Sequence, residues 1–152
     1  MRPWERRLFH ASTAAVVATG FAYFWMKYVL QTDDPFALVN HPWQGAMLAW
    51  HLIASPVLVL AFGILFNSHV MKKLNVKGMA NRRTGYASLV TFAAMLFSGY
   101  LLQVTSSEPL LRALVIVHVG AGAVFTASYV AHLAISWRLS RRSRRNALAS
   151  AA

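Results

Sequence analysis

The chain has 152 residues, of which 57% are hydrophobic and 12% are charged, whereas soluble domains usually carry about a quarter charged residues. This composition indicates one membrane domain, and the lack of cysteine excludes disulfides, iron–sulfur clusters and thiolate metal sites. The formal net charge is +11, but the basic residues cluster at the ends of apolar runs and not along one helical face, which argues against nucleic-acid binding.

Four apolar stretches are long enough to cross a bilayer core of about 30 Å, which takes roughly 20 helical residues. They lie near 8–30, 44–66, 84–104 and 110–137. Lipid offers no partner to an unpaired backbone group, so each stretch should be an uninterrupted helix. The first run exceeds the usual signal-peptide core of about 7–15 residues, so we interpret it as a retained span. We therefore predict an all-α integral membrane four-helix bundle over 1–137, followed by a basic, disordered tail over 138–152.

The basic residues predict the orientation of these spans. Thirteen of the fifteen fall on one side, namely Arg2, Arg6, Arg7, Lys72, Lys73, Lys77, Arg82, Arg83, Arg138, Arg141, Arg142, Arg144 and Arg145. By the positive-inside rule, both termini are cytoplasmic and 31–45 is the one sizeable outer loop. All four acidic residues are expected outside the spans. These features predict a multi-pass protein of the bacterial inner (cytoplasmic) membrane.

Six histidines are present, at His10, His41, His51, His69, His118 and His132. His51 and His118 should each lie roughly 11–12 Å deep, counted from the outer surface. His10 and His132 lie near the cytoplasmic ends of the first and fourth spans. Because 14 residues make close to four helical turns, His118 and His132 project on nearly the same face. The four histidines thus form an outer and an inner pair, and the fourth span contributes to both.

Ionisable groups inside a membrane are unfavourable and usually mark a function. A neutral imidazole that ligates iron offsets this cost, and two ligands from facing helices make a bis-histidine haem site. The matched depths of His10, His51, His118 and His132 therefore predict haem ligation, the alternative being hydrogen-bonded structural histidines or a proton relay. Nearby small residues would leave room for a flat macrocycle, although close helix packing explains them as well; they are Gly20, Gly63, Ser98, Gly99, Gly120 and Gly122.

Other residues near the cytoplasmic surface have two interpretations each. His69, at the end of the second span, is either a solvated interfacial residue or a contact of a quinone or haem propionate. Four arginines occupy places where inner propionates could be paired, although setting the topology is their plainer role: Arg6, Arg7, Arg82 and Arg83. His41 is interpreted as a loop residue.

The segments that carry these histidines resemble a known family. They read RRLFH (6–10), AWHLIASPVLVLAFGILFNSH (49–69), RRTGYASLVTFAAMLFSGYLLQV (82–104) and HVGAGAVFTASYVAH (118–132). Together they resemble the di-haem cytochrome b subunits of nickel–iron hydrogenase and respiratory formate dehydrogenase. The resemblance implies two haem b groups, one held by His51 and His118, the other by His10 and His132 beside a quinone site. The short loops are similar to those of small stand-alone versions, which implies a periplasmic cytochrome c or another redox subunit as partner.

The expected function is electron transfer across the membrane between that partner and the quinone pool. No catalytic residues are predicted, because the chain has no nucleophile constellation, phosphate loop or substrate-oxidising domain. It would serve as the electron-transfer subunit of a quinone-linked oxidoreductase. Two alternatives stay open: a histidine-based proton or metal-ion transporter, which would need intramembrane carboxylates, and a non-redox membrane anchor, which would not need depth-matched histidines.

Overall fold

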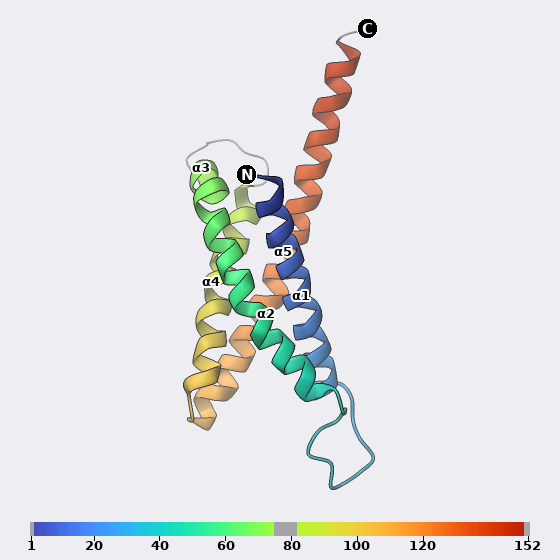
Figure 1. The fold of residues 1–152 in the computed structure, drawn as a ribbon, viewed down its shortest axis with the longest axis vertical. Coiled ribbons are helices and arrows are strands. Elements are labelled where there is room, and N and C mark those ends of the chain that lie inside the picture. The colour runs from blue at the N-terminus through green and yellow to red at the C-terminus, as the bar shows by residue number, and fades with distance from the viewer. Residues whose placement is uncertain (1, 75–81, 151–152) are drawn as a thin grey trace. The chain divides into compact units, whose positions relative to one another are not determined.

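The computed structural model describes residues 2–74 and 82–150, and within these ranges the chain contains helices and no strand. The elements are α1 (Pro3–Tyr28), α2 (Gln44–Leu65), the π-helical turn η1 (Phe66–Val70), α3 (Met71–Leu74), α4 (Arg82–Val104) and α5 (Glu108–Ala149) (Figure 1). Helices α1, α2, α4 and α5 are each long and apolar enough to cross a membrane. The predictions of an all-α fold and a multi-pass membrane protein are thereby confirmed.

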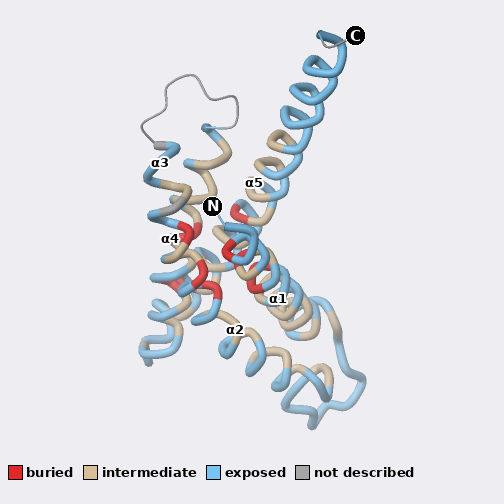
Figure 2. Tube along the Cα trace, turned by 45° about the horizontal axis from the view of Figure 1, so that its top comes forward, coloured by how far each residue is buried: buried red, intermediate tan, exposed pale blue. Residues whose placement is uncertain are grey.

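The chain forms two compact units, Met1–Asn75 and Val76–Ala152. Unit 1 is built on the packing of α1 against α2, and unit 2 on the packing of α4 against α5. Few side chains are buried, and most of the helix surface is exposed or intermediate (Figure 2). Apolar surface of this extent suits helices that face lipid. Lys77, which the orientation argument uses, lies outside the described residues.

Helix α1 begins five residues before the predicted span. Proline is well suited to the first helical position, which Pro3 occupies. A Glu5 carboxylate oxygen accepts a hydrogen bond from the backbone N–H of Arg2 at 2.8 Å, and a negative charge is favourable at this end of a helix dipole. Glu5 is therefore a buried residue in the first turn of α1.

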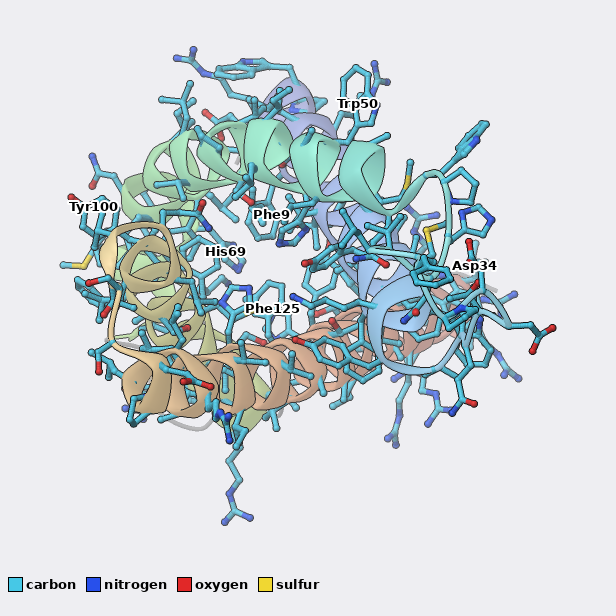
Figure 3. The ribbon with its side chains drawn as sticks, turned by 90° about the horizontal axis from the view of Figure 1, so that it is seen from below. Phe9, Asp34, Trp50, His69, Tyr100 and Phe125 are labelled. Carbon is cyan, nitrogen blue, oxygen red and sulfur yellow. The ribbon has the colours of Figure 1, made fainter. Side chains whose placement is uncertain are left out.

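Unit 1 is held together by small and aromatic side chains. The rings of Phe9 (α1) and Phe62 (α2) are 6.4 Å apart, centroid to centroid, and Ala61 is 1% exposed. Thr13 is buried, and its hydroxyl donates to the Phe9 carbonyl at 2.7 Å, which satisfies the polar group within α1. In Figure 3 the labelled side chains of Phe9 and His69 lie on one side of α2, and Trp50 projects from the other.

Unit 2 is an antiparallel helix pair whose contacts keep one register along most of α4. The contact residues of α4 are three or four positions apart, and their partners on α5 are three or four positions apart in the opposite direction. One stripe of each helix therefore packs against the other. The contacts are Thr84–His132 and Ser88–Ser128 by hydrogen bonds (3.2 and 2.9 Å), Phe92–Phe125 by rings (5.9 Å), Met95 against Gly122, and Ser98–His118 by a hydrogen bond (3.1 Å). This register fixes which α4 residues can touch each histidine of α5.

Helix α5 does not end with the apolar span but continues to Ala149. The prediction of a disordered tail is therefore wrong over 138–149. The segment contains no glycine or proline, and its alanine, leucine and arginine residues are strong helix formers. A helix that is already formed extends without a new nucleation step, so each added residue gains a backbone hydrogen bond.

Candidate functional site

His118 of α5 lies against the backbone of α4. Its Nδ1 is 3.2 Å from the Met95 carbonyl oxygen and 3.1 Å from the Ser98 hydroxyl oxygen. A carbonyl oxygen can only accept, so Nδ1 carries the proton and donates. A Cβ atom on Gly99 would lie 3.0 Å from Cε1 of His118. The ring thus occupies space that exists because residue 99 has no side chain.

His51 of α2 makes the equivalent contacts with α1 in unit 1. Its Nδ1 is 3.0 Å from the Val16 carbonyl oxygen and 3.4 Å from the Thr19 hydroxyl oxygen. A Cβ atom on Gly20 would lie 2.8 Å from Cε1 of the ring. Here again the carbonyl requires a protonated Nδ1, and a hydroxyl–glycine pair on the neighbouring helix receives the imidazole.

His132 repeats the arrangement further along α5. Its Nδ1 is 3.2 Å from the Thr84 hydroxyl oxygen, and a Cβ atom on Gly85 would lie 3.6 Å from its Cε1. Thr84 and Ser98 are 14 residues apart on α4, and His118 and His132 are 14 apart on α5. The matched spacings bring each hydroxyl–glycine pair to one histidine. Neither Thr19 nor Thr84 was predicted from the sequence; the common spacing on α4 and α5 is the signal that reveals Thr84.

The carbonyl contacts define which nitrogen His51 and His118 present, whereas the Thr84 hydroxyl can donate to His132 Nδ1 or accept from it. When Nδ1 donates a hydrogen bond, the neutral imidazole has its lone pair on Nε2, and that nitrogen is the one able to ligate a metal. The same bond fixes the rotation of the ring and makes it a stronger electron donor. His51 and His118, each with a backbone carbonyl as acceptor, therefore have the tautomer and orientation that metal-ligating histidines require.

His10 and His69 have different surroundings. His10 follows Phe9 on α1, and the two ring centroids are 6.3 Å apart. His69 belongs to η1, where the backbone N–H of Met71 donates to the Phe66 carbonyl in the wider π-helical pattern. Isolated π-helical turns inside longer helices are frequent at functional sites. Both histidines are half-buried.

The arginines predicted near the propionates are exposed in the structure. Arg6 and Arg7 lie in the early part of α1, and Arg82 and Arg83 open α4. Arg82 donates to the Tyr86 hydroxyl at 3.2 Å, and its guanidinium carbon lies 5.4 Å from the centre of that ring. The structure therefore shows a cation–π partner for Arg82 on its own helix.

Unit 1 also has an apolar hollow of about 540 Å³ near the loop that follows α1. It is lined by Phe21, Ala22, Trp25, Met26, Leu30 and His41. His41 Nδ1 accepts the backbone N–H of Trp43 at 3.1 Å, so a neutral His41 has its proton on Nε2. His41 therefore makes a hydrogen bond within its loop and also lines the apolar hollow.

The histidines are divided between the two units. His10, His51 and His69 belong to unit 1, and His118 and His132 to unit 2, so each predicted haem pair takes one histidine from each unit. Over 2–74 and 82–150, no group of three or more His, Asp or Glu side chains is placed to hold a metal ion. A scan against family models gave no match, and neither the curated proteins nor the solved structures gave one.

Proposed function

We propose that the chain is a di-haem b-type cytochrome of the bacterial inner membrane, a four-helix bundle with both termini in the cytoplasm. It would transfer electrons between a periplasmic redox partner, a cytochrome c or a dehydrogenase subunit, and the quinone pool. The observation that carries the proposal is the repeated contact of a histidine with a hydroxyl–glycine pair on the neighbouring helix, made by His51, His118 and His132.

The donor set suits haem b. Bis-histidine ligation takes two neutral imidazoles that bind through one nitrogen each, and a hydrogen bond from Nδ1 leaves Nε2 as that nitrogen. Glycines at the contact keep bulky side chains away from the rings of His51 and His118. The bound haem would supply reversible one-electron redox chemistry, while the chain supplies ligands, their spacing and an apolar surrounding.

Each proposed outer ligand lies well inside its own helix, beside the glycine of the neighbouring helix that contacts it. In unit 1, Gly20 lies eight residues before the end of α1 and His51 seven after the start of α2, which averages about 11 Å from the helix ends. In unit 2, Gly99 lies five residues before the end of α4 and His118 ten after the start of α5, which also averages about 11 Å. We pair His51 with His118, and His10 with His132, from their positions in the sequence.

In this proposal, the remaining candidate residues contact the haem propionates or quinone on the cytoplasmic side. Arg6, Arg7, Arg82 and Arg83 are positioned by sequence to neutralise propionates, since guanidinium groups bind carboxylates in a bidentate manner. His69 would contact quinone or a propionate. A quinone also needs a proton route to water, which a histidine at the bilayer surface can provide.

The two alternatives predict different features. A proton or metal-ion transporter needs carboxylates along its path, and Glu5, buried at the start of α1, accepts a hydrogen bond from Arg2 as a helix cap does. A membrane anchor has no need to fix the rotation of imidazole rings deep inside apolar helices. The hydrogen bonds of His51 and His118 therefore favour the cytochrome.

Haem content tests the proposal directly. The purified protein, supplied with haem during expression, should give about two haems per chain in a pyridine haemochrome assay and a low-spin reduced-minus-oxidised spectrum. The variants His51→Ala and His118→Ala should each lose one haem, the same one, whereas His41→Ala should keep both. No haem in a folded wild-type protein would reject the proposal, and loss of different haems in the two variants would reject the pairing.

A further inference from the structure

Helix α5 is much longer than a membrane span requires. Its 42 residues extend about 63 Å, whereas a bilayer core of about 30 Å takes roughly 20 residues. After Trp137 the helix continues to Ala149, and every residue of this extension is exposed. In Figure 1 it is the end of α5 that leads to the C-terminus. The extension is therefore a rigid arm attached to the apolar part of α5.

The arm carries five of the fifteen basic residues of the chain. Four of them are separated by three, one and three residues, the spacing that places side chains on one stripe of a helix. They are Arg138, Arg141, Arg142 and Arg145. No acidic residue follows Glu108, so no ion pair within the arm can neutralise this stripe. By contrast, Arg112 near the other end of α5 is paired with Glu108 at 2.6 Å.

The residue at the start of the arm, Trp137, is of the type expected at a membrane–water interface. Tryptophan is enriched at the membrane–water interface, and the Arg141 guanidinium lies 4.5 Å from the centre of the Trp137 ring. The headgroup layer on one side is about 5–7 Å thick, and the rise from Arg138 to Arg142 is about 6 Å. Arg145 lies about one further turn out. We therefore expect the stripe to begin within the layer that contains lipid phosphates.

We propose that the stripe of Arg138, Arg141, Arg142 and Arg145 binds the phosphate groups of anionic lipid, with highest affinity for a headgroup that carries two phosphates. Arginine suits this role because its planar guanidinium binds phosphate through two parallel hydrogen bonds. Arginines on successive turns of one stripe can contact two phosphates of one molecule. The interaction would fix the depth and rotation of α5, and it does not depend on the proposed electron transfer.

Native mass spectrometry of the full chain in a mild detergent tests this inference. The protein is titrated with phosphatidylcholine, phosphatidylglycerol and cardiolipin of matched acyl chains. We expect retention in the order cardiolipin, phosphatidylglycerol, phosphatidylcholine. Each arginine near the surface contributes about fivefold to the affinity for anionic lipid, so changing all four to glutamine should weaken cardiolipin binding at least tenfold. Arg112→Gln, on the opposite side of the span, should have no effect.

A rearranged variant separates the stripe from simple net charge. It combines Arg138→Ser with Ser140→Arg and Arg142→Ser with Ser143→Arg, which preserves composition while moving two arginines off the stripe. Reduced cardiolipin binding by this variant supports the proposal. Binding equal to wild type would overturn it in favour of net charge alone. Equal retention of all three lipids by wild type would also overturn it. All changed positions are exposed, and if a multiple variant aggregates, Arg142→Gln compared with Arg144→Gln, which lies off the stripe and removes the same charge, gives the same comparison.

Discussion

Gly20 and His51 are in such close contact that a Cβ atom on the glycine would lie 2.8 Å from Cε1 and 3.0 Å from Nδ1 of the imidazole. Both atoms of the ring are fixed by its hydrogen bond to the Val16 carbonyl oxygen at 3.0 Å. The imidazole can therefore occupy this position only because residue 20 is glycine. Close helix packing is not the only reason for the glycine. The same relationship joins Gly99 to His118, at 3.0 Å.

Gly20→Ala should displace the imidazole of His51. The added methyl group overlaps the ring, so the ring must rotate and lose its bond to Val16, with destabilisation of about 1–3 kcal/mol. We expect loss of one of two haems per chain and a lower Tm. Gly63→Ala is the matched control, because nothing lies within 4 Å of its added Cβ. Gly85→Ala, with His132 at 3.6 Å, should be tolerated. Equal haem content and Tm in the Gly20 and Gly63 variants would contradict the prediction.

Ser98→Ala should alter the electronic properties of His118 without removing it. The Nδ1 atom keeps the Met95 carbonyl as an acceptor at 3.2 Å, so the ring stays in place while the contact to the hydroxyl oxygen at 3.1 Å is lost. A hydrogen bond contributes about 0.5–1.5 kcal/mol, which corresponds to a shift in midpoint potential on the order of 20–60 mV for one electron. Redox titration should show both haems present and one potential shifted.

Two further variants complete this test. Ser98→Thr restores the hydroxyl and should return the potential toward that of wild type. Ser140→Ala removes an exposed hydroxyl that bonds to the Ser136 carbonyl within α5, so both potentials should stay unchanged. Unchanged potentials in Ser98→Ala would mean that the hydroxyl does not act on a haem ligand, even if haem is bound.

His10 and His69 differ as candidates for the second ligand of the inner pair. His10 lies within the regular helix α1, whereas His69 belongs to the π-helical turn that follows α2. We expect His10→Ala to reduce haem content from about two to about one per chain, with the loss confined to the haem that His132→Ala also removes. His69→Ala should retain both haems and slow the reaction with quinone. Haem loss in His69→Ala alone would show that the π-helical turn supplies the ligand.

Sequence reasoning succeeded where a single physical cause dominates. Runs of apolar residues predicted the four long helices, because length and hydropathy alone decide whether a helix can cross a bilayer. Helix α1 begins before the predicted apolar span because Pro3 and Glu5 act through local capping, which hydropathy does not measure. The arm after Trp137 was misjudged because its charge suggested disorder, while its residues favour extension of an existing helix.

Only part of the candidate site could be predicted from the sequence. The histidines were identified from their depth and spacing, and Gly20 and Gly99 from their small size. The contacts of Thr19 and Thr84 with histidines depend on how two helices are aligned. The sequence pattern of one helix alone does not determine this alignment. For Thr84 the register becomes visible only when the 14-residue spacing on α4 is compared with that on α5.

The location of quinone exchange is the last prediction. A quinone head needs hydrogen-bond donors at the interface, a proton route to water and an apolar slot for its tail. In unit 1, His69 in η1 and Lys72 in α3 offer donors on the predicted cytoplasmic side. The outer end of the same unit offers an alternative, the apolar hollow lined by Trp25 and His41.

We expect the cytoplasmic site to be used, because the lysines and arginines there can supply and stabilise charge during proton uptake, whereas the outer loop carries Asp33 and Asp34, which suit docking of a soluble basic carrier. A photoaffinity quinone should label peptides around His10 or His69, and His69→Ala should reduce that labelling. Trp25→Ala, which opens the outer hollow, should leave it unchanged. Labelling confined to 31–45 or 104–112 would place the quinone on the outer side. The partner that exchanges electrons would then have to dock on the cytoplasmic face, where the basic ends of the helices favour an acidic protein.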